Sequence, residues 1–368
     1  MKGKVLATLF AFAVTVHAQQ WRMATPGYRY EFPRDHFTHP DFQTEWWYYT
    51  GNLTAADGHR FGFELTFFRQ ALSLTPQQIA DSDSVWRPDQ VYLAHLALSD
   101  IDGKQFFHTE RLNRAGPGLA GAGLADQKYW NGNWQSKWIS LKTGEQELRA
   151  VTDKLDLQLR LTPQKPFVIN GENGISRKGP QAGDASHYIT YTRLGAAGKL
   201  RWNNGDYDVT GLAWMDHEFF SDSNDEDLAG WDWFAIQLDD RREVMLYRLR
   251  SKSGGDRYSS GTYVDADGKS RYLNAKDFHI TPLSSWHSAS SGATYPVSWK
   301  ISVPSIGLEL TEKTALENQE LFTADDVSPT YWEGTVAYDG TMAGTPVHGV
   351  GYLEMTGYAR QLPGQAAP

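Results

Sequence analysis

The chain has 368 residues, no cysteine and a formal net charge of −9. The length predicts two domains, each large enough to bury a core. The absence of cysteine excludes disulfides, iron–sulfur clusters, cysteine-ligated zinc and a cysteine nucleophile. The negative charge argues against a general nucleic-acid binder, and we expect no nucleic-acid partner.

The first 18 residues have the pattern of a secretory signal peptide. Lys2 and Lys4 make a basic start, and residues 5–16 form an almost unbroken apolar run that is too short to span a bilayer. Val16 and Ala18 then occupy the −3 and −1 positions of a cleavage site. We therefore expect cleavage after Ala18 and a secreted or periplasmic protein, and no later segment is apolar enough to predict a membrane span.

Strands are predicted along most of the remaining chain. Residues 61–67, 155–161 and 297–303 alternate between apolar and polar side chains, which is typical of half-buried antiparallel strands. Only one short helix is predicted, after Thr75. Asp-Gly pairs predict tight hairpin turns and lie at 57–58, 102–103, 267–268 and 339–340. Many short strands joined by such turns predict an all-β sandwich or barrel.

A weak internal repeat indicates two tandem β units. Residues 46–53 lead through a turn into a strand that ends at Arg69, and residues 231–238 lead in the same way to Arg248. We accordingly predict two domains, one over residues 19–210 and one over residues 211–368.

The densest group of ionisable residues lies within residues 211–220. If this segment is a strand, Trp214, Asp216 and Glu218 share one face and His217 lies on the other. His217 can shuttle a proton near neutral pH, and burial can turn Asp216 or Glu218 into a general acid. We predict these three ionisable residues as catalytic, with a purely structural network of buried carboxylates as the alternative.

Aromatic residues elsewhere are candidates for a ligand site. Their rings suit a pocket wall, although core packing explains them equally well. His95 stands in an otherwise apolar strand, where it is either a hydrogen-bonded core residue or part of a cavity wall. The predicted ligand-binding residues are Trp47, His95, Trp214, Trp231, Trp233, Tyr247, Trp332 and Tyr352.

Several motifs are missing from the sequence. It contains no G-x-S-x-G nucleophile elbow, no H-E-x-x-H zinc helix, no P-loop and no dinucleotide-binding glycine fingerprint. His36, His39 and Asp41 are spaced loosely enough to bind a metal, but nothing in the sequence fixes a coordination geometry. We expect neither a metal nor another cofactor.

Taken together, the motifs resemble the AttH family of secreted lipocalin-like proteins. Its opening signature is Glu45-Trp46-Trp47-Tyr48-Tyr49, and the resemblance covers roughly residues 32–358. It continues through residues 61–69, 95–100, 211–218, 230–234, 331–334 and 351–358. It implies two tandem lipocalin-like β-barrels and apolar substrates that bind in or between the barrels.

The resemblance also implies a class of chemistry. Members of this family are often labelled secreted hydrolases or carotenoid 1,2-hydratases, and the sequence offers no nucleophile motif for a hydrolase. A hydratase needs a carboxylic acid to protonate an alkene, and the family's Trp-x-Asp-His segment corresponds to Trp214, Asp216 and His217. We expect an exported protein that acts on an apolar isoprenoid, lipid or polyketide-like molecule, as a hydratase, lyase or isomerase. The alternatives are a non-catalytic carrier of such a molecule and an envelope assembly factor with an exporter partner.

Overall fold

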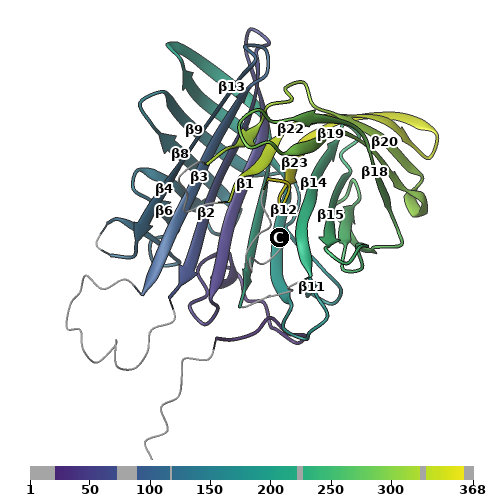
Figure 1. Ribbon diagram of the computed structural model, residues 1–368. Helices are drawn as coiled ribbons and strands as arrows, with labels where there is room; N and C mark the ends of the chain where they lie inside the picture. Colours follow the sequence, from purple (N-terminus) through teal and green to yellow (C-terminus); the bar gives the residue numbers. More distant parts are fainter. Residues whose placement is uncertain (1–20, 73–88, 117, 222–226, 324–328, 360–368) are drawn as a thin grey trace, which may run out of the picture.

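The protein folds into two antiparallel β-sheets that lie side by side in the computed structural model (Figure 1). The structure describes residues 21–72, 89–116, 118–221, 227–323 and 329–359. The predicted signal peptide and the helix predicted after Thr75 lie outside these residues. Within the described ranges, the helical segments are the short 3-10 turns η1 (Arg34–His36) and η2 (Pro304–Ile306), and no helix there is long and apolar enough to cross a membrane.

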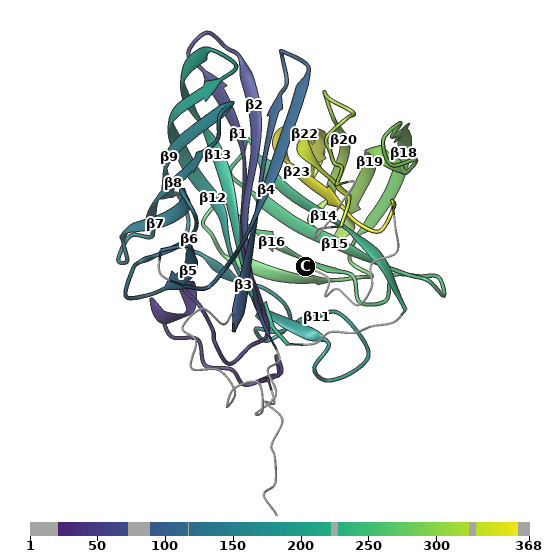
Figure 2. The same ribbon diagram turned by 60° about the vertical axis from the view of Figure 1, so that its left-hand side comes forward.

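The first sheet curls into a nearly closed barrel (Figure 2). Its strands follow the order β4-β3-β2-β1-β13-β12-β9-β8-β7-β6-β5, and β10 and β11 also pair with β12. The two ends of the sheet meet where the Asn131 amide donates hydrogen bonds to the carbonyls of Tyr92 (3.0 Å) and Arg111 (3.1 Å). The strands are β1 (Thr44–Ala55), β2 (Arg60–Ala71), β3 (Gln90–Asp100), β4 (Gln105–Arg114), β5 (Ala120–Gly123), β6 (Lys128–Asn131), β7 (Trp134–Ser140), β8 (Glu145–Val151), β9 (Leu155–Pro163), β10 (Val168–Ile169), β11 (Ser176–Arg177), β12 (Ala185–Trp202) and β13 (Gly205–Phe220).

The second sheet forms a half-barrel. Its order is β17-β16-β15-β14-β23-β22-β20-β19-β18, and β21 pairs with β22. The strands are β14 (Leu228–Leu238), β15 (Glu243–Ser251), β16 (Ser260–Val264), β17 (Ser270–Asn274), β18 (His279–His287), β19 (Thr294–Val303), β20 (Leu308–Lys313), β21 (Glu320–Leu321), β22 (Tyr331–Met342) and β23 (Thr345–Met355). The two sheets confirm the predicted all-β fold with tandem lipocalin-like units, of which the second is only half closed.

The interior of the first barrel is packed with side chains. The alternating strands predicted at 61–67 and 155–161 point their apolar residues into it, where Phe63 and Leu157 belong to one buried core with Trp47 and Met215. Burying each such side chain contributes roughly 1.5–3 kcal/mol, so this interior stabilises the barrel. Because the space is filled in this way, the carboxyl groups of the predicted site are found on the opposite face of the same strands.

The predicted turns are confirmed at three Asp-Gly pairs, including residues 102–103 between β3 and β4, and wrong at one. Gly58 (φ 92°) and Gly268 (φ 91°) adopt the positive φ that tight hairpins require. Residues 339–340 instead lie within β22, and the turn falls at residues 343–344, where φ is 50° and 81°. Gly340 is needed for a different reason, because a Cβ atom there would lie 1.9 Å from the carbonyl oxygen of Glu309.

The chain passes from the first sheet to the second later than predicted. β13 (Gly205–Phe220) pairs with β1 and β12, whereas the second sheet begins with β14 at Leu228. The predicted boundary between residues 210 and 211 falls within β13 (Gly205–Phe220) of the first sheet. Residues 211–220 belong to the first barrel because Ala213 and Met215 are buried in its core.

The weak sequence repeat corresponds to two equivalent hairpins, β1–β2 and β14–β15. In the first, Glu45 lies opposite Arg69 and forms an ion pair with it at 3.0 Å. In the second, Asp232 lies opposite Arg248 and the ion-pair distance is 2.7 Å. The arginine that ends each repeat therefore neutralises a buried carboxylate on the neighbouring strand.

Polar side chains dock the two sheets against each other. The Gln237 amide of β14 donates hydrogen bonds to the carbonyls of Thr192 (2.8 Å) and Ala213 (3.0 Å) in the first sheet. The Asn52 amide of β1 donates in turn to the carbonyl of Gly351 in β23 at 3.1 Å. These contacts create a buried layer between the sheets, and this layer holds the candidate site.

Candidate active site

The alternation of β13 separates the three predicted catalytic residues. Asp216 and Glu218 point toward the second sheet together with Trp214, which packs in the ring cluster between the sheets. His217 points to the other face, where it contacts Glu45. The structure therefore brings Asp216 and Glu218 together and places His217 in a different environment, because neighbouring residues of a strand face opposite sides.

Asp216 is a buried carboxyl group held by neutral donors. The Tyr188 hydroxyl donates to Oδ2 at 2.7 Å, and the Thr190 hydroxyl (2.6 Å) and Trp214 indole (2.9 Å) donate to Oδ1. Burial raises the pKa of Asp216 to about 7, even though all three donors act in the opposite direction. Within the described ranges no arginine forms an ion pair with Asp216, so this group can gain or lose a proton near neutral pH.

Glu218 lies one step further along the same face. Its Oε2 accepts a hydrogen bond from the Ser186 hydroxyl and lies 3.5 Å from Nζ of Lys178. Burial raises the pKa of Glu218 to about 7, while the neighbouring Lys178 acts to lower it. Its Oε1 atom is buried and has no hydrogen-bond partner among the described residues. The site therefore contains a second carboxyl group that can exchange a proton near neutral pH.

Three further carboxyl groups share this layer. Glu333 of β22 accepts a hydrogen bond from the Tyr48 hydroxyl at 2.6 Å, and burial raises its pKa well above the usual value. Burial also raises the pKa of Glu64 in β2 to about 7 and that of Glu354 in β23 to about 8. Because these carboxyl groups are buried and lie close to one another, most of them are protonated, and therefore uncharged, at neutral pH.

Aromatic rings surround the carboxyl groups. The rings of Trp214 and Trp233 meet edge to face with centroids 6.1 Å apart, and the Trp233 indole donates to the Tyr188 hydroxyl at 3.1 Å. Such ring faces can stabilise a positive charge that develops nearby. The buried rings of this cluster are Tyr48, Tyr188, Trp214, Trp231, Trp233, Tyr247 and Tyr352.

Five of the eight predicted ligand-binding residues belong to this ring cluster, namely Trp214, Trp231, Trp233, Tyr247 and Tyr352. His95 also faces the second sheet, since its Nδ1 atom lies 2.7 Å from the Tyr331 hydroxyl. Trp47 and Trp332 lie instead in the cores of the first and second units. Their indoles donate to the carbonyls of His36 (3.1 Å) and Glu317 (2.7 Å), which is the core-packing role proposed as the alternative.

His217 belongs to a second network, on the other face of the sheet. Its Nε2 atom lies 2.8 Å from Oε1 of Glu45, and Nδ1 of His39 lies 2.7 Å from the same oxygen. Arg69 donates to the other oxygen of Glu45 at 3.0 Å. Although Glu45 is fully buried, the two histidines and Arg69 hold its pKa well below the usual value. Glu45 is therefore a charged anchor in the first barrel.

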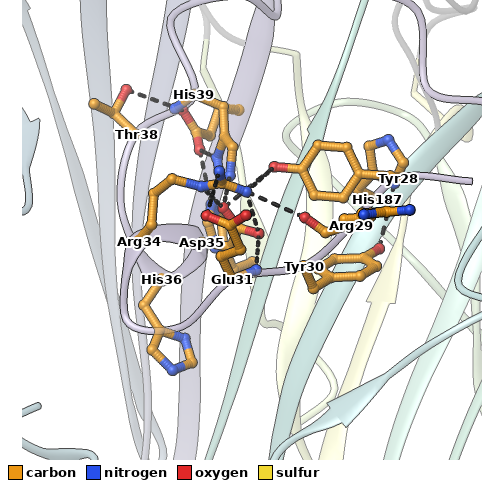
Figure 3. A network of polar contacts seen from close by, with 12 residues as sticks. Tyr28, Arg29, Tyr30, Glu31, Arg34, Asp35, His36, Thr38, His39 and His187 are labelled. Carbon is orange, nitrogen blue, oxygen red and sulfur yellow. Dashed lines mark hydrogen bonds and ion pairs between the residues drawn. The ribbon is translucent and has the colours of Figure 1, made fainter.

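This network continues into the segment that precedes β1 (Figure 3). Asp35 lies 3.2 Å from Nε2 of His39, and Arg34 donates to it at 2.6 Å. The Tyr28 hydroxyl also donates to Asp35, at 3.2 Å. These contacts brace the segment before β1, which the contact between His39 and Glu45 ties to the first barrel. We assign the network a structural role.

The three residues His39, Glu45 and His217 also bring possible metal-ligating atoms within 4.8 Å of one another. These atoms already lie at hydrogen-bonding distance, and the Arg69 guanidinium occupies the second oxygen of Glu45. A cation placed there would face a fixed positive charge. The arrangement therefore fits a hydrogen-bonded anchor better than a metal centre.

The sequence interpretation missed several members of the site. Tyr48, Tyr188 and Lys178 were not predicted, and Glu64 and Glu333 were not recognised as ionisable groups of one cluster. Alternation places Glu64 on the polar face of its strand, but it cannot show that a second sheet covers that face.

A separate cavity of about 280 Å³ opens at the margin of the inter-sheet layer. Phe106 and His108 line it, and they lie opposite Ser99 and Ala97 of β3. None of the five clustered carboxyl groups lines this cavity. The remaining lining residues are Lys104, Ser290, Leu316, Asn318, Glu320 and Phe322.

These features define a lipocalin-like protein of two β units with a buried layer of acids and aromatic rings between them. The chain belongs to the AttH-like family, whose model matches residues 23–358. It is similar to a crystal structure of an AttH-type protein from Nitrosomonas europaea, with 34% identity and a TM-score of 0.81 over 92% of this chain and 99% of the other.

Two more distant relatives are enzymes by name. The crystal structure of kievitone hydratase from Nectria haematococca matches with a TM-score of 0.69 over 94% of this chain and 98% of the other, but at 14% identity it shows the fold alone. A dehydratase, asqC of Emericella nidulans, is 24% identical over 149 residues. That match covers 39% of this chain and 42% of the dehydratase, which is less than half the length of either.

Proposed function

We propose that this protein is a hydro-lyase that adds water to, or removes it from, an apolar small molecule held between the two sheets. The names of the two distant relatives, a hydratase and a dehydratase, support this reaction class. The absence of a nucleophile elbow from the sequence argues against a serine hydrolase.

The environment of Asp216 is the observation that carries the proposal. Hydration of an alkene begins when an acid transfers a proton to carbon, and dehydration begins when an acid protonates the departing hydroxyl. The buried Asp216 has a pKa of about 7, so a substantial share of it is protonated at neutral pH. The rings of Trp214 and Trp233 lie beside it and can stabilise a carbocation.

Glu218 acts as the base that complements the acid Asp216. Its pKa is also about 7, and two acids in one buried layer divide protons between them. When Asp216 is protonated and Glu218 is ionised, one group donates a proton while the other activates or receives water. Fixed hydroxyl donors to both carboxyl groups hold them in place for this exchange.

The test is turnover in oxygen-18 water with a panel of isoprenoid alkenes and their hydrated products, read by mass spectrometry. We expect the wild-type protein to incorporate the heavy oxygen and Asp216→Asn to lose activity by at least about a hundredfold, in line with the contribution of a general acid. The matched control is Asp208→Asn, because Asp208 lies on the same strand but is exposed and pairs with the exposed Lys199. Equal turnover by wild type and Asp216→Asn would remove Asp216 from the mechanism.

We also propose that the chain is exported, on the strength of its first 18 residues. N-terminal sequencing of the protein from its native host should then give a chain that begins at Gln19 and is recovered outside the cytoplasm. An uncleaved Met1 terminus in the cytoplasmic fraction would contradict this proposal.

A further inference from the structure

Two lysines are buried in the described part of the chain, and their surroundings differ. Nζ of Lys165 donates to the Glu243 carboxylate at 2.7 Å, to the carbonyl of Asp265 at 2.5 Å and to the carbonyl of Arg241. All three protons of its ammonium group therefore have acceptors. Nζ of Lys178 is equally buried but has no hydrogen-bond partner among the described residues.

Lys178 lies inside the inter-sheet layer, directly after β11. Its backbone N–H donates to the carbonyl of Asp184 at 2.7 Å, which fixes the backbone at this point. Nζ lies 4.1 Å from the ring centroid of Tyr247, 5.3 Å from that of Tyr188 and 3.5 Å from Oε2 of Glu218. The amine therefore projects among the rings and acids of the proposed site.

The charge state of Lys178 is set by opposing influences. Burial, the largest of them, lowers the pKa of the amine, while the facing carboxyl groups of Glu218, Asp216 and Glu354 act to raise it. The Tyr247 ring also favours the charged form. Burial prevails, so a larger share of Lys178 is the free, nucleophilic amine than for an exposed lysine.

We propose that Lys178 is an amine nucleophile that forms an imine with a carbonyl-bearing substrate at this site. A desolvated amine that has no hydrogen-bond partner among the described residues and lies 3.5 Å from a proton-exchanging carboxyl group is the arrangement that Schiff-base formation requires. Lys165 shows the opposite arrangement, since its three acceptors leave no free lone pair. The inference rests on the proposed function and narrows its substrate class to ketones or aldehydes with a hydroxyl group on the β carbon.

The chemistry balances without a cofactor. The amine lone pair bonds to the carbonyl carbon, the carbonyl oxygen takes one proton from the amine and a second from a carboxylic acid, and water leaves to give the iminium. A carboxylate then removes a proton from the α carbon to give the enamine. The enamine electrons expel the β-hydroxyl group, which leaves as water with a proton from the acid. Hydrolysis of the iminium returns the free lysine and releases the α,β-unsaturated carbonyl product.

The experiment isolates the first step of this sequence. The full-length protein is incubated at neutral pH with 4-phenyl-2-butanone and sodium cyanoborohydride, and its peptides are mapped by mass spectrometry. The ketone has no β-hydroxyl group, so the outcome does not depend on whether dehydration occurs. We expect a gain equal to the mass of the ketone less one oxygen on the peptide that contains Lys178, formed at least about tenfold faster than on Lys165, because burial favours the free amine of Lys178 whereas acceptors hold all three ammonium protons of Lys165.

Two variants separate nucleophilicity from charge. Lys178→Arg keeps a positive charge beside Glu218 and Lys178→Met keeps the length of the side chain without a charge, and both should abolish the adduct at this position. If neither variant folds, the peptide map of the wild-type protein still decides the question. Equal labelling of Lys178 and Lys165, or labelling only of exposed lysines, would overturn the proposal. Turnover that depends on Asp216 but shows no adduct would retain the proposed function and reduce Lys178 to a counter-ion of Glu218.

Discussion

The Tyr48 hydroxyl of the first sheet donates a hydrogen bond of 2.6 Å to Glu333 of the second sheet, although 285 positions separate them in the sequence. Tyr48 lies on β1 with its side chain turned away from the barrel core, and Glu333 lies on β22 facing it. The other oxygen of Glu333 is buried and has no hydrogen-bond partner in the described ranges. This single contact links the stability of the inter-sheet layer to the protonation of an acid within it.

Removing the hydroxyl in Tyr48→Phe should lower the free energy of unfolding by about 1–3 kcal/mol, because the Glu333 carboxyl group loses its donor while it remains buried. Urea-induced unfolding measures the difference. Glu333→Gln is the companion variant, because the oxygen of its amide can still accept the hydrogen bond from Tyr48. The amide is also uncharged, like the protonated acid that it replaces. A small effect of Glu333→Gln at neutral pH is the expected result, and a loss as large as that of Tyr48→Phe would indicate an ionised Glu333.

The cluster of acids should make the protein less stable as the pH rises. Folding raises the pKa of Asp216, Glu218 and Glu64 to about 7 and that of Glu354 to about 8, from ordinary values of 3.8 for Asp and 4.5 for Glu. Between these limits the folded protein binds more protons than the unfolded chain. The stabilisation is therefore complete at a pH below the ordinary values and is lost as the pH rises through the raised values.

Urea unfolding across this range provides the measurement, with about 1.4 kcal/mol for each unit of pKa displacement as the upper limit for each group. Glu354→Gln removes one of the four titrations and should flatten the decline between about pH 5 and pH 8. Glu309→Gln removes a half-exposed carboxylate on β20 and should leave the slope unchanged. A Glu354→Gln variant whose stability declines as steeply as that of the wild type over this interval would contradict the raised pKa of Glu354.

Replacing the arginine that pairs with Glu45 should lower the free energy of unfolding. Arg69→Met leaves the charged Glu45 without its guanidinium in a fully buried position, and breaking such a pair costs about 3–5 kcal/mol. The matched control is Arg160→Met, because Arg160 pairs with Glu145 on the surface and such pairs contribute about 1 kcal/mol or less. Chemical denaturation of the two variants compares them directly. A similar cost for both would show that Glu45 is neutral in the folded protein.

Alternation in the sequence predicted which face each strand residue occupies, but not what covers that face. It separated His217 from Asp216 and Glu218, and it grouped Trp214 with the two acids. It could not distinguish Trp47, which lies in the barrel core, from Trp233, which lies between the sheets, because both faces of these strands are buried.

Sequence alternation could not predict contacts between residues that are distant along the chain, and the reason is physical. The partner of Tyr48 is fixed by how the two sheets dock, which depends on many weak contacts that no local pattern encodes. Lys178 follows a two-residue strand and carries no periodic signal, so its burial beside Glu218 is visible only in three dimensions. The turn predicted at residues 339–340 failed for a related reason, since Gly340 is needed for a close approach to Glu309 in the neighbouring strand.

The close approach of the two sheets depends on a glycine in the same way. A Cβ atom on Gly62 would lie 2.7 Å from Cβ of Thr335 and 3.2 Å from the hydroxyl of Tyr352, both on the second sheet. Gly62→Ala must therefore push the sheets apart, and overpacking of this kind costs about 1–3 kcal/mol. The separation should also weaken the hydrogen bond between Tyr48 and Glu333, which lies in the same layer.

Thermal or urea unfolding of Gly62→Ala tests this expectation against Gly123→Ala. A Cβ atom on Gly123 would lie 3.6 Å from the Asp126 carboxylate, which is an ordinary contact distance, so that variant should unfold like the wild type. Adding Thr335→Gly to Gly62→Ala removes the atoms that clash and should recover part of the lost stability. If Gly62→Ala is as stable as Gly123→Ala, the space between the sheets at Gly62 accommodates a methyl group. The buried rings then set the spacing of the sheets instead.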